Sequence, residues 1–129
     1  MEKRFPEWMD IKKDLHRETM PPPHVNEGEI WWTSIGENIG FEINGKNTFF
    51  TRPVLIFKKL SSSLFFIIPL TTKIKNGTWF VMYQFQSYQV TACLHQARTI
   101  DYRRLSSRLG RLDKPNFEKI KLRFRDLYL

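Results

Sequence analysis

Between residues 28 and 100 the apolar residues come in short runs separated by polar turns, and this spacing limits what the chain can fold into. The runs are rich in aromatic and β-branched residues, which favour strands. Strands this short at such close spacing predict a small, strongly bent sheet or barrel. We expect strands at 28–35, 49–60, 64–70, 78–85 and 92–100, followed by a short basic turn at 101–110.

Helical spacing occurs only at the two ends of the chain. Near the start, Trp8, Ile11 and Leu15 recur at i, i+3 and i+7 with charged residues between them, which predicts a short helix. Consecutive prolines at 21–23 cannot continue a helix, so residues 20–27 are predicted to form an extended linker.

The last part of the chain again shows helical spacing, with Pro115 suited to a first helical turn. Its apolar residues form one stripe that is expected to pack on the sheet. The predicted fold is mainly β with helices (α+β), divided into an N-terminal helical arm with its linker, 1–26, and a main domain, 27–129. The stripe consists of Phe117, Ile120, Phe124 and Leu127.

Composition excludes several classes of protein. The 129 residues include one cysteine, Cys93, so neither an intramolecular disulfide nor a cysteine zinc cluster can form. The histidines, His16, His24 and His95, lack the spacing of a metal site. No apolar run approaches the ~18 residues that a bilayer requires, and the start lacks the apolar region of a secretory signal. We expect a cytoplasmic protein that uses no metal and no cofactor.

The net charge of +8 is concentrated in the middle and the end of the chain. Residues 1–26 carry five bases and five acids, whereas no acid occurs between Glu42 and Asp101. Positive charge without carboxylates attracts polyanions, so nucleic acid is the first candidate partner. A merely basic, solvated surface stays open as the alternative. The seven bases of the acid-free segment are Lys46, Arg52, Lys58, Lys59, Lys73, Lys75 and Arg98.

The chain has residues for a simple metal-free reaction, although the common catalytic motifs are missing. It contains neither a nucleophile elbow nor a phosphate-binding glycine loop. A small basic β-domain can still cleave RNA, because RNA supplies its own nucleophile in the 2′-OH. Such a site needs a base, donors for the phosphorane oxygens and an acid for the leaving oxygen. The candidates are Glu42, Arg52, Thr71 and His95.

Each candidate also has a structural alternative. Arg52 could end its strand and extend into water, and Thr71 could satisfy local backbone groups. Glu42 could be a solvated loop charge, and His95 an ordinary histidine of the barrel. Taken singly these residues indicate little, and only their combination is informative.

Five motifs in fixed order resemble the MazF/PemK family of toxin endoribonucleases from bacterial toxin–antitoxin modules. The resemblance covers roughly residues 27–129 and leaves the N-terminal arm unexplained. The motifs are GEIWW at 28–32, GFEING at 40–45, RPVLIF at 52–57, FIIPLTT at 66–72 and QARTIDYRRLSSRLGRL at 96–112, followed by the final helix.

This resemblance implies an SH3-like barrel that works as a homodimer and cleaves single-stranded RNA. Arg52 and Thr71 match the family's arginine and threonine around the scissile phosphate, and Glu42 matches the acidic residue of the first long loop. Cleavage is then metal-independent and leaves 2′,3′-cyclic phosphate and 5′-OH ends. The implied protein partner is a cognate antitoxin that lays a flexible, acidic segment over the RNA face, and no membrane contact is expected.

Two features depart from the family's pattern. Members commonly have an acidic residue where this chain has His95, and an imidazole can act as acid or base near neutral pH, so activity could be kept or lost. The first loop is longer before Arg52, with KNTFFT at 46–51, which would reshape base recognition. Besides the four catalytic candidates, the expected RNA-binding residues are Phe41, Lys46, Lys73, Lys75, Gln96 and Arg98.

Alternatives to a ribonuclease stay open at this point. A gyrase poison of the CcdB type shares the barrel, but those toxins depend on a Trp-Gly-Ile ending and this chain ends Arg-Asp-Leu-Tyr-Leu. A non-catalytic relative that binds RNA is consistent with His95 and the extra arm. The arm itself could pack across a dimer, cover the RNA groove or cap the open end of the barrel, and capping is the interpretation we prefer.

Overall fold

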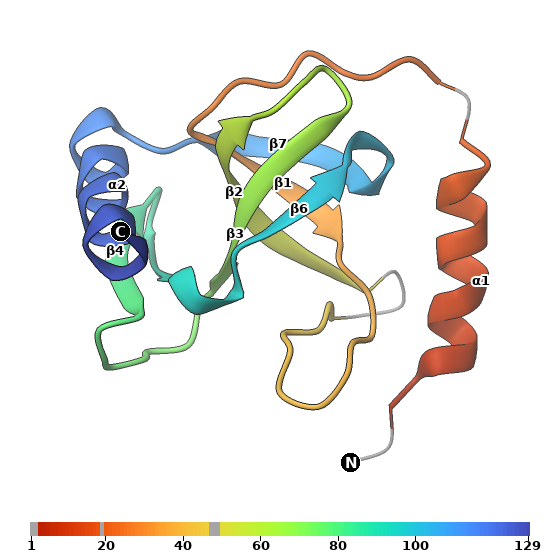
Figure 1. The fold of residues 1–129 in the computed structure, drawn as a ribbon, viewed down its shortest axis with the longest axis horizontal. Coiled ribbons are helices and arrows are strands. Elements are labelled where there is room, and N and C mark those ends of the chain that lie inside the picture. Colours follow the sequence, from red (N-terminus) through yellow and green to blue (C-terminus); the bar gives the residue numbers. More distant parts are fainter. Residues whose placement is uncertain (1–2, 19, 47–49) are drawn as a thin grey trace.

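The computed structural model describes residues 3–18, 20–46 and 50–129, which form a bent β-sheet with a helix on either side (Figure 1). The predicted fold, mainly β with a C-terminal helix and an N-terminal helical arm, is confirmed. Residue 49, where the second strand was predicted to begin, lies outside the described residues. The elements are α1 (Phe5–His16), β1 (Glu29–Ser34), β2 (Thr51–Lys59), β3 (Leu64–Thr71), β4 (Phe80–Phe85), β5 (Tyr88–Cys93), the short 3₁₀ helices η1 (Leu94–Gln96) and η2 (Tyr102–Arg104), β6 (Arg98–Asp101), β7 (Leu105–Arg111) and α2 (Lys114–Tyr128).

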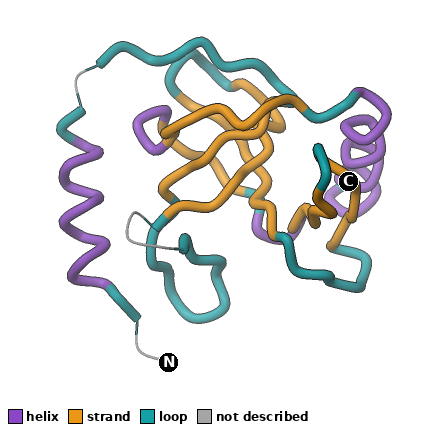
Figure 2. The backbone as a smooth tube through the Cα atoms, turned by 180° about the vertical axis from the view of Figure 1, so that it is seen from behind, coloured by secondary structure: helices purple, strands orange, loops and turns teal. Residues whose placement is uncertain are grey.

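The sheet has the strand order β4-β5-β3-β2-β1-β7, with β6 paired to β3 outside this path. Every pairing between named strands is antiparallel. The strands wrap around one another in Figure 2 but do not close into a ring. Because β2 and β3 are antiparallel neighbours, the start of β2 and the end of β3 lie at the same end of the sheet. This arrangement places Arg52 and Thr71 at one end of the domain.

The core lies on both faces of the central strands. In β2, Leu55 belongs to one buried cluster, whereas Val54 and Ile56 belong to another, as expected for side chains that alternate across a strand. The first cluster also contains Ile120 of α2 and contacts the partly buried Phe124. The predicted packing of the C-terminal apolar stripe on the sheet is therefore confirmed.

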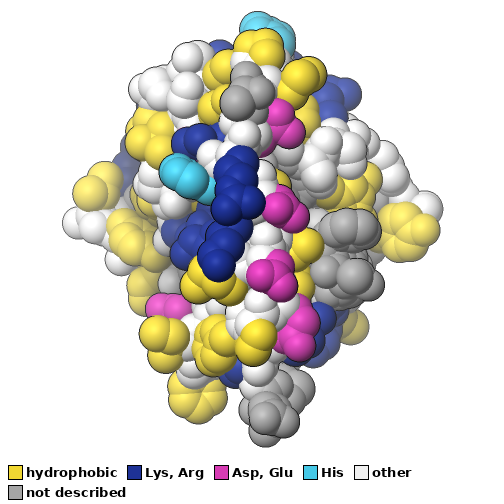
Figure 3. Space-filling model, turned by 90° about the vertical axis from the view of Figure 1, so that its right-hand side faces the viewer, with side chains coloured by type: hydrophobic (Ala, Val, Ile, Leu, Met, Phe, Trp, Pro, Cys, Tyr) yellow, Lys and Arg dark blue, Asp and Glu magenta, His cyan; other side chains and the backbone are white. Residues whose placement is uncertain are grey.

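Both helices have local reasons to begin where they do. In α2, the Asp113 side chain accepts a hydrogen bond from the Asn116 amide, and Pro115 occupies the first turn. In α1, Pro6 lies in the first turn, and Trp8 is the buried residue, packed against Gly36 and Phe50. Figure 3 shows that the face carrying α1 has acidic and basic side chains side by side. Within the described part of the chain, neither helix is long and apolar enough to span a membrane.

The prediction of one strand at 92–100 is wrong. β5 ends at Cys93, η1 interrupts the chain, and β6 then pairs with β3 rather than with β4. β4 and β5 form a hairpin whose turn includes Gln86 in the left-handed region, with φ of 57°. Left-handed turns usually carry glycine or asparagine, so the sequence held no signal for this hairpin.

The prediction of a basic turn at 101–110 is also wrong. Residues 102–104 form η2, and β7 follows and pairs with β1. Serine, arginine and glycine in this stretch are weak strand formers, so the pairing with β1 determines its conformation. Register shifts beside Trp31 and Trp32 show that the pairing is irregular.

Candidate functional site

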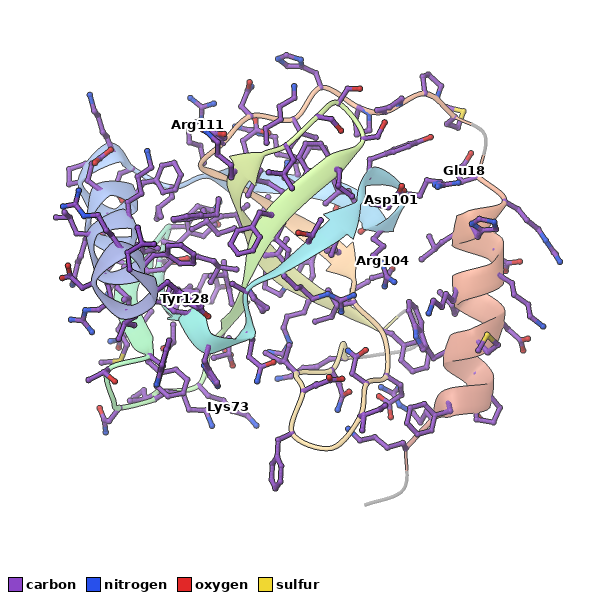
Figure 4. All side chains as sticks on the ribbon, in the orientation of Figure 1. Glu18, Lys73, Asp101, Arg104, Arg111 and Tyr128 are labelled. Atoms are coloured by element: carbon purple, nitrogen blue, oxygen red, sulfur yellow. The ribbon has the colours of Figure 1, made fainter. Side chains whose placement is uncertain are left out.

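A pocket of about 230 Å³ lies where the loop after β1, the start of β2, the end of β3 and η1 meet. It brings together seven of the ten residues predicted for the site, and one of these, Lys73, is labelled in Figure 4. Ile43, Phe80 and Cys93, which the sequence did not single out, also line it. The seven predicted residues are Phe41, Arg52, Thr71, Lys73, Lys75, His95 and Gln96.

Arg52 is fixed by two backbone carbonyls. Its Nε donates to the Asn44 oxygen at 2.9 Å, and its Nη1 donates to the Leu70 oxygen at 3.3 Å. Burial lowers the pKa of the Arg52 guanidinium. A guanidinium has five N–H donors, so these two bonds orient the group while others can meet an anion in the pocket. Asn44 acts through its backbone, which no pattern of side chains could have revealed.

Thr71 and Thr91 hold the loop that carries two lysines of the pocket. The Lys73 amide donates to Thr71 Oγ1 at 3.2 Å, and Thr91 Oγ1 donates to the Lys73 carbonyl at 2.9 Å. Thr71 therefore does satisfy a local backbone group, as its structural alternative supposed. It also lines the pocket, and a hydroxyl that accepts one bond can still donate another. Lys73 and Lys75 enter the pocket from this loop.

Gln96 attaches the loop after β1 to the rest of the site. Its Oε1 accepts from the Ile43 amide at 3.2 Å, and its Nε2 donates to the Phe41 carbonyl at 3.3 Å. The Phe41 side chain is fully exposed at this position. Gln96, predicted to read RNA, thus holds the loop in place by its amide, while the Phe41 ring is open to solvent.

Glu42 and Arg98 lie beside the pocket rather than in it. Both line a neighbouring pocket of about 390 Å³, and Glu42 Oε1 accepts from the Ile39 amide at 3.0 Å within its own loop. His95 and Gln96 line both pockets and so connect them. The structure therefore does not bring Glu42 into the Arg52 pocket.

His95 and Lys46 complete the surroundings of Arg52. The exposed His95 ring meets the edge of Phe80, with centroids 5.0 Å apart. Burial lowers the pKa of Lys46, and the charges of Arg52 and Lys73 lower it further. The Lys46 amide donates to the carbonyl of Thr51 at 2.8 Å, so Lys46 lies next to the residue before Arg52, although residues 47–49 of the same loop lie outside the described part.

The site is a cationic pocket with donors and an imidazole but without a metal-binding set. Nowhere in residues 3–18, 20–46 and 50–129 do three His, Cys, Asp or Glu side chains gather closely enough to hold a metal ion. Burial raises the pKa of the Cys93 thiol, which keeps it protonated and poorly nucleophilic. Such an arrangement can bind a phosphodiester and stabilise extra negative charge on its oxygens.

Comparison with known proteins yields one family and one fold. A model of the PemK-like, MazF-like toxins of type II toxin–antitoxin systems matches residues 26–128. A solved structure of an endoribonuclease in complex with its cognate antitoxin, from a mycobacterial species, superposes with a TM-score of 0.61 at 14% identity, covering 80% of this chain and 93% of that one. At this identity the likeness establishes the fold, in agreement with the MazF-like fold expected from the sequence. No curated protein sequence matches the chain significantly.

Proposed function

Because this chain belongs to the family of PemK-like, MazF-like toxins of type II toxin–antitoxin systems, we propose that it is a toxin endoribonuclease that cleaves single-stranded RNA. The observation that carries the proposal is the Arg52 guanidinium, fixed by two carbonyls in a pocket with Thr71, Lys73 and His95. Cleavage needs no metal or cofactor and leaves 2′,3′-cyclic phosphate and 5′-OH ends. The proposed toxin domain spans residues 27–129, and residues 1–26 form a separate arm.

The proposed reaction is an attack of the 2′-oxygen on the neighbouring phosphorus. The bond from O2′ to phosphorus forms, and the bond from phosphorus to O5′ then breaks. Between these two events, negative charge gathers on the two non-bridging oxygens of the phosphorane. Arg52 stabilises that charge, and the Thr71 hydroxyl donates to one oxygen. Because its guanidinium lies in the pocket beside these oxygens, Arg52 is also the group that we assign to donate a proton to O5′.

The proton of the 2′-OH needs a base, and the structure favours His95 over Glu42. His95 lines the pocket with Arg52, whereas Glu42 lies in the neighbouring pocket and is bound to its own loop. An imidazole is suited to this role near neutral pH. We therefore assign the base to His95, which stands where family members commonly have an acid.

RNA is proposed to bind through phosphate contacts and one stacked base. Lys46, Lys73 and Lys75 lie around Arg52 and attract the phosphates of the RNA. Arg98 lines the neighbouring pocket, over which the RNA strand is proposed to continue. The exposed ring of Phe41 offers a surface on which an unpaired base can stack. The toxin is proposed to act in the cytoplasm as a homodimer, and a cognate antitoxin with an acidic flexible segment is proposed to block this cationic site.

Replacement of Arg52 tests the proposed function. Purified protein and the Arg52→Ala variant are incubated with a long single-stranded RNA in EDTA, and the fragment ends are mapped. We expect selective cuts with cyclic-phosphate ends that disappear in Arg52→Ala, because the phosphorane loses its stabilising charge. Arg111→Ala, which removes an arginine of β7 far from Lys73 in Figure 4, serves as the matched control and is expected to cut normally.

Two results would contradict this proposal. A folded Arg52→Ala protein that still cuts would remove the mechanism. A folded wild-type protein that binds RNA without cutting it over a wide pH range would favour the alternative of a binding protein. In such a protein, the replacement of the family's usual acidic residue by His95 would go with the loss of cleavage.

A further inference from the structure

The N-terminal arm forms an ion pair with a nearly buried carboxylate of the loop after β1. Glu37 has a side chain that is 6% exposed, and both its oxygens bind Arg4. Oε2 accepts from the Arg4 amide at 2.7 Å, and Oε1 accepts from Arg4 Nη2 at 3.3 Å. A buried carboxylate is costly without such partners, so this pair couples the loop to the arm. Arg4 lies outside the residues that the family model matches.

The arm contacts the beginning and the end of this loop. At its beginning, Trp8 packs so closely on Gly36 that a Cβ there would lie 2.1 Å from the indole ring. At its end, Trp8 packs on the Phe50 ring with centroids 5.6 Å apart, and the Arg4 guanidinium lies 4.2 Å from the same ring. Arg4 Nη2 also donates to the Gly45 carbonyl at 3.4 Å. The arm therefore supports the loop at both ends.

The same loop orients Arg52. Gly45 follows Asn44, whose carbonyl accepts the Arg52 Nε bond, and Asn44 Oδ1 accepts from the Asn38 amide inside the loop. In Figure 4, α1 lies on the far side of this loop from Lys73, and none of its residues, 5–16, lines the pocket. A path of direct contacts thus leads from Arg4 through Gly45 and Asn44 to Arg52.

We propose that Arg4 and Glu37 are positioning residues, which hold the loop after β1 so that the Asn44 carbonyl fixes the Arg52 guanidinium in its working orientation. The inference rests on the proposed function for its effect on cleavage. Its structural part, the orientation of Arg52 by the arm, is testable without RNA. In this role the arm supports the reaction, and it neither caps the sheet passively nor covers the RNA site.

The chain contains a matched control for this pair. Glu29 of β1 also has a side chain that is 6% exposed, and it binds Arg108, which is 47% exposed compared with 44% for Arg4. Burial opposes ionisation of Glu29, but hydrogen bonds from Asn26, Trp31 and Arg108 outweigh it and lower the pKa. Glu29→Gln therefore removes a comparable buried charge. The partners of the Glu29 carboxylate in the described part of the chain are Asn26, Trp31 and Arg108, all outside the loop after β1.

The experiment compares the full-length wild type with Glu37→Gln, Arg4→Met and Glu29→Gln. The first readout is the NMR signal of the Arg52 Nε–H group and its rate of exchange with water. We expect the signal to move and its exchange to accelerate in Glu37→Gln and Arg4→Met but not in Glu29→Gln. Unfolding by urea shows which variants are folded and how far each is destabilised.

The second readout is RNA cleavage, measured as kcat and KM. We expect kcat to fall between about 10- and 100-fold in Glu37→Gln with little change in KM, since a misplacement of about 1 Å costs about 10²-fold. The Glu29→Gln variant is expected to keep the wild-type kcat.

The outcomes separate this inference from the proposed function. If the Arg52 signal stays unchanged in Glu37→Gln while stability falls as in Glu29→Gln, the pair is only structural and the inference is wrong. If the signal moves but the wild type does not cleave RNA, the proposed function fails while the positioning of Arg52 stands.

Discussion

At the scale of single residues, Tyr83 carries a buried hydroxyl for which the described residues provide no hydrogen-bond partner. The residue is 5% exposed and lies in the cluster beneath α2. Burial raises the pKa of its phenol, with smaller contributions in the same direction from Cys93 and Asp113. The folded state therefore holds the Tyr83 proton to a higher pH than the unfolded state does.

Removal of this hydroxyl is expected to stabilise the protein. A buried hydroxyl without a partner costs about 1–3 kcal/mol, so we expect Tyr83→Phe to raise the free energy of unfolding by about 1 kcal/mol at neutral pH. Because the folded pKa is raised, the unfolded state loses this proton first, and stability falls as pH rises above about 10. Urea unfolding at pH 7 and pH 10.5 checks both effects.

Tyr88→Phe, at an exposed tyrosine of β5, is the matched control. It is expected to change neither the free energy of unfolding at pH 7 nor its fall at high pH. A loss of stability in Tyr83→Phe at pH 7 would mean that the hydroxyl has a favourable partner after all.

The residues of the candidate site differ in how far they could be predicted from the sequence. The resemblance of motifs led to Arg52 and Thr71, and the structure places them in one pocket with His95. Glu42, chosen in the same way, lies outside that pocket because its carboxylate closes a turn within its loop. Asn44 was missed because its contribution is a backbone carbonyl, which any residue type would supply equally.

At the scale of elements, the strongly apolar strands were predictable and the polar ones were not. β2 and β3 consist of long apolar runs, so their positions follow from composition alone. β7 is partly exposed along its length and contains serines and a glycine, so its pairing with β1 depends on contacts far away in the chain. Local sequence cannot report such contacts.

The docking of α1 depends on the absence of a side chain at Gly36. A Cβ at this position would overlap the Trp8 ring, and the φ of 86° adds strain for any other residue. We therefore expect Gly36→Ala to displace the arm and to expose Trp8 and the linker. Limited proteolysis at residues 20–27 and tryptophan fluorescence measure this displacement.

Gly40→Ala is the matched control for the arm. Gly40 lies in the same loop with a φ of 57°, but a Cβ there would meet no atom within 4 Å. It carries the backbone strain without the contact to Trp8, so we expect the arm to stay docked. Equal proteolysis of both variants would attribute the effect to strain in the loop and not to Trp8.

At the scale of the whole molecule, the excess positive charge lies on the domain, and the arm has no net charge. Residues 1–26 carry five bases and five acids, so the excess comes from the rest of the chain. Four bases, Lys46, Arg52, Lys73 and Lys75, lie in or beside the pocket. This distribution provides a counter-charge for nucleic acid at one place.

The dependence of RNA binding on salt measures how many phosphates these four residues contact. Each contact to single-stranded nucleic acid contributes about −0.7 to the slope of log K against log salt, so we expect a slope of about −3. Binding is measured with an RNA whose 2′-OH groups are replaced by hydrogen, which prevents cleavage. Lys73→Gln is expected to make the slope shallower by about 0.7.

Lys119→Gln, on the exposed side of α2, is the control and is expected to leave the slope unchanged. A slope near zero for the wild type would exclude phosphate binding by this pocket.

The contacts of Trp8 also determine the order in which parts of the protein can fold during synthesis. A ribosome releases the arm before the domain that receives it, because chains emerge from the N-terminal side. The surface that receives Trp8 consists of Gly36, Phe50 and the Arg104 guanidinium, which lies 5.6 Å from the indole ring. Arg104 follows Trp8 by 96 residues in the chain, so the arm has to wait for the synthesis of the sheet and of η2 before it can dock completely.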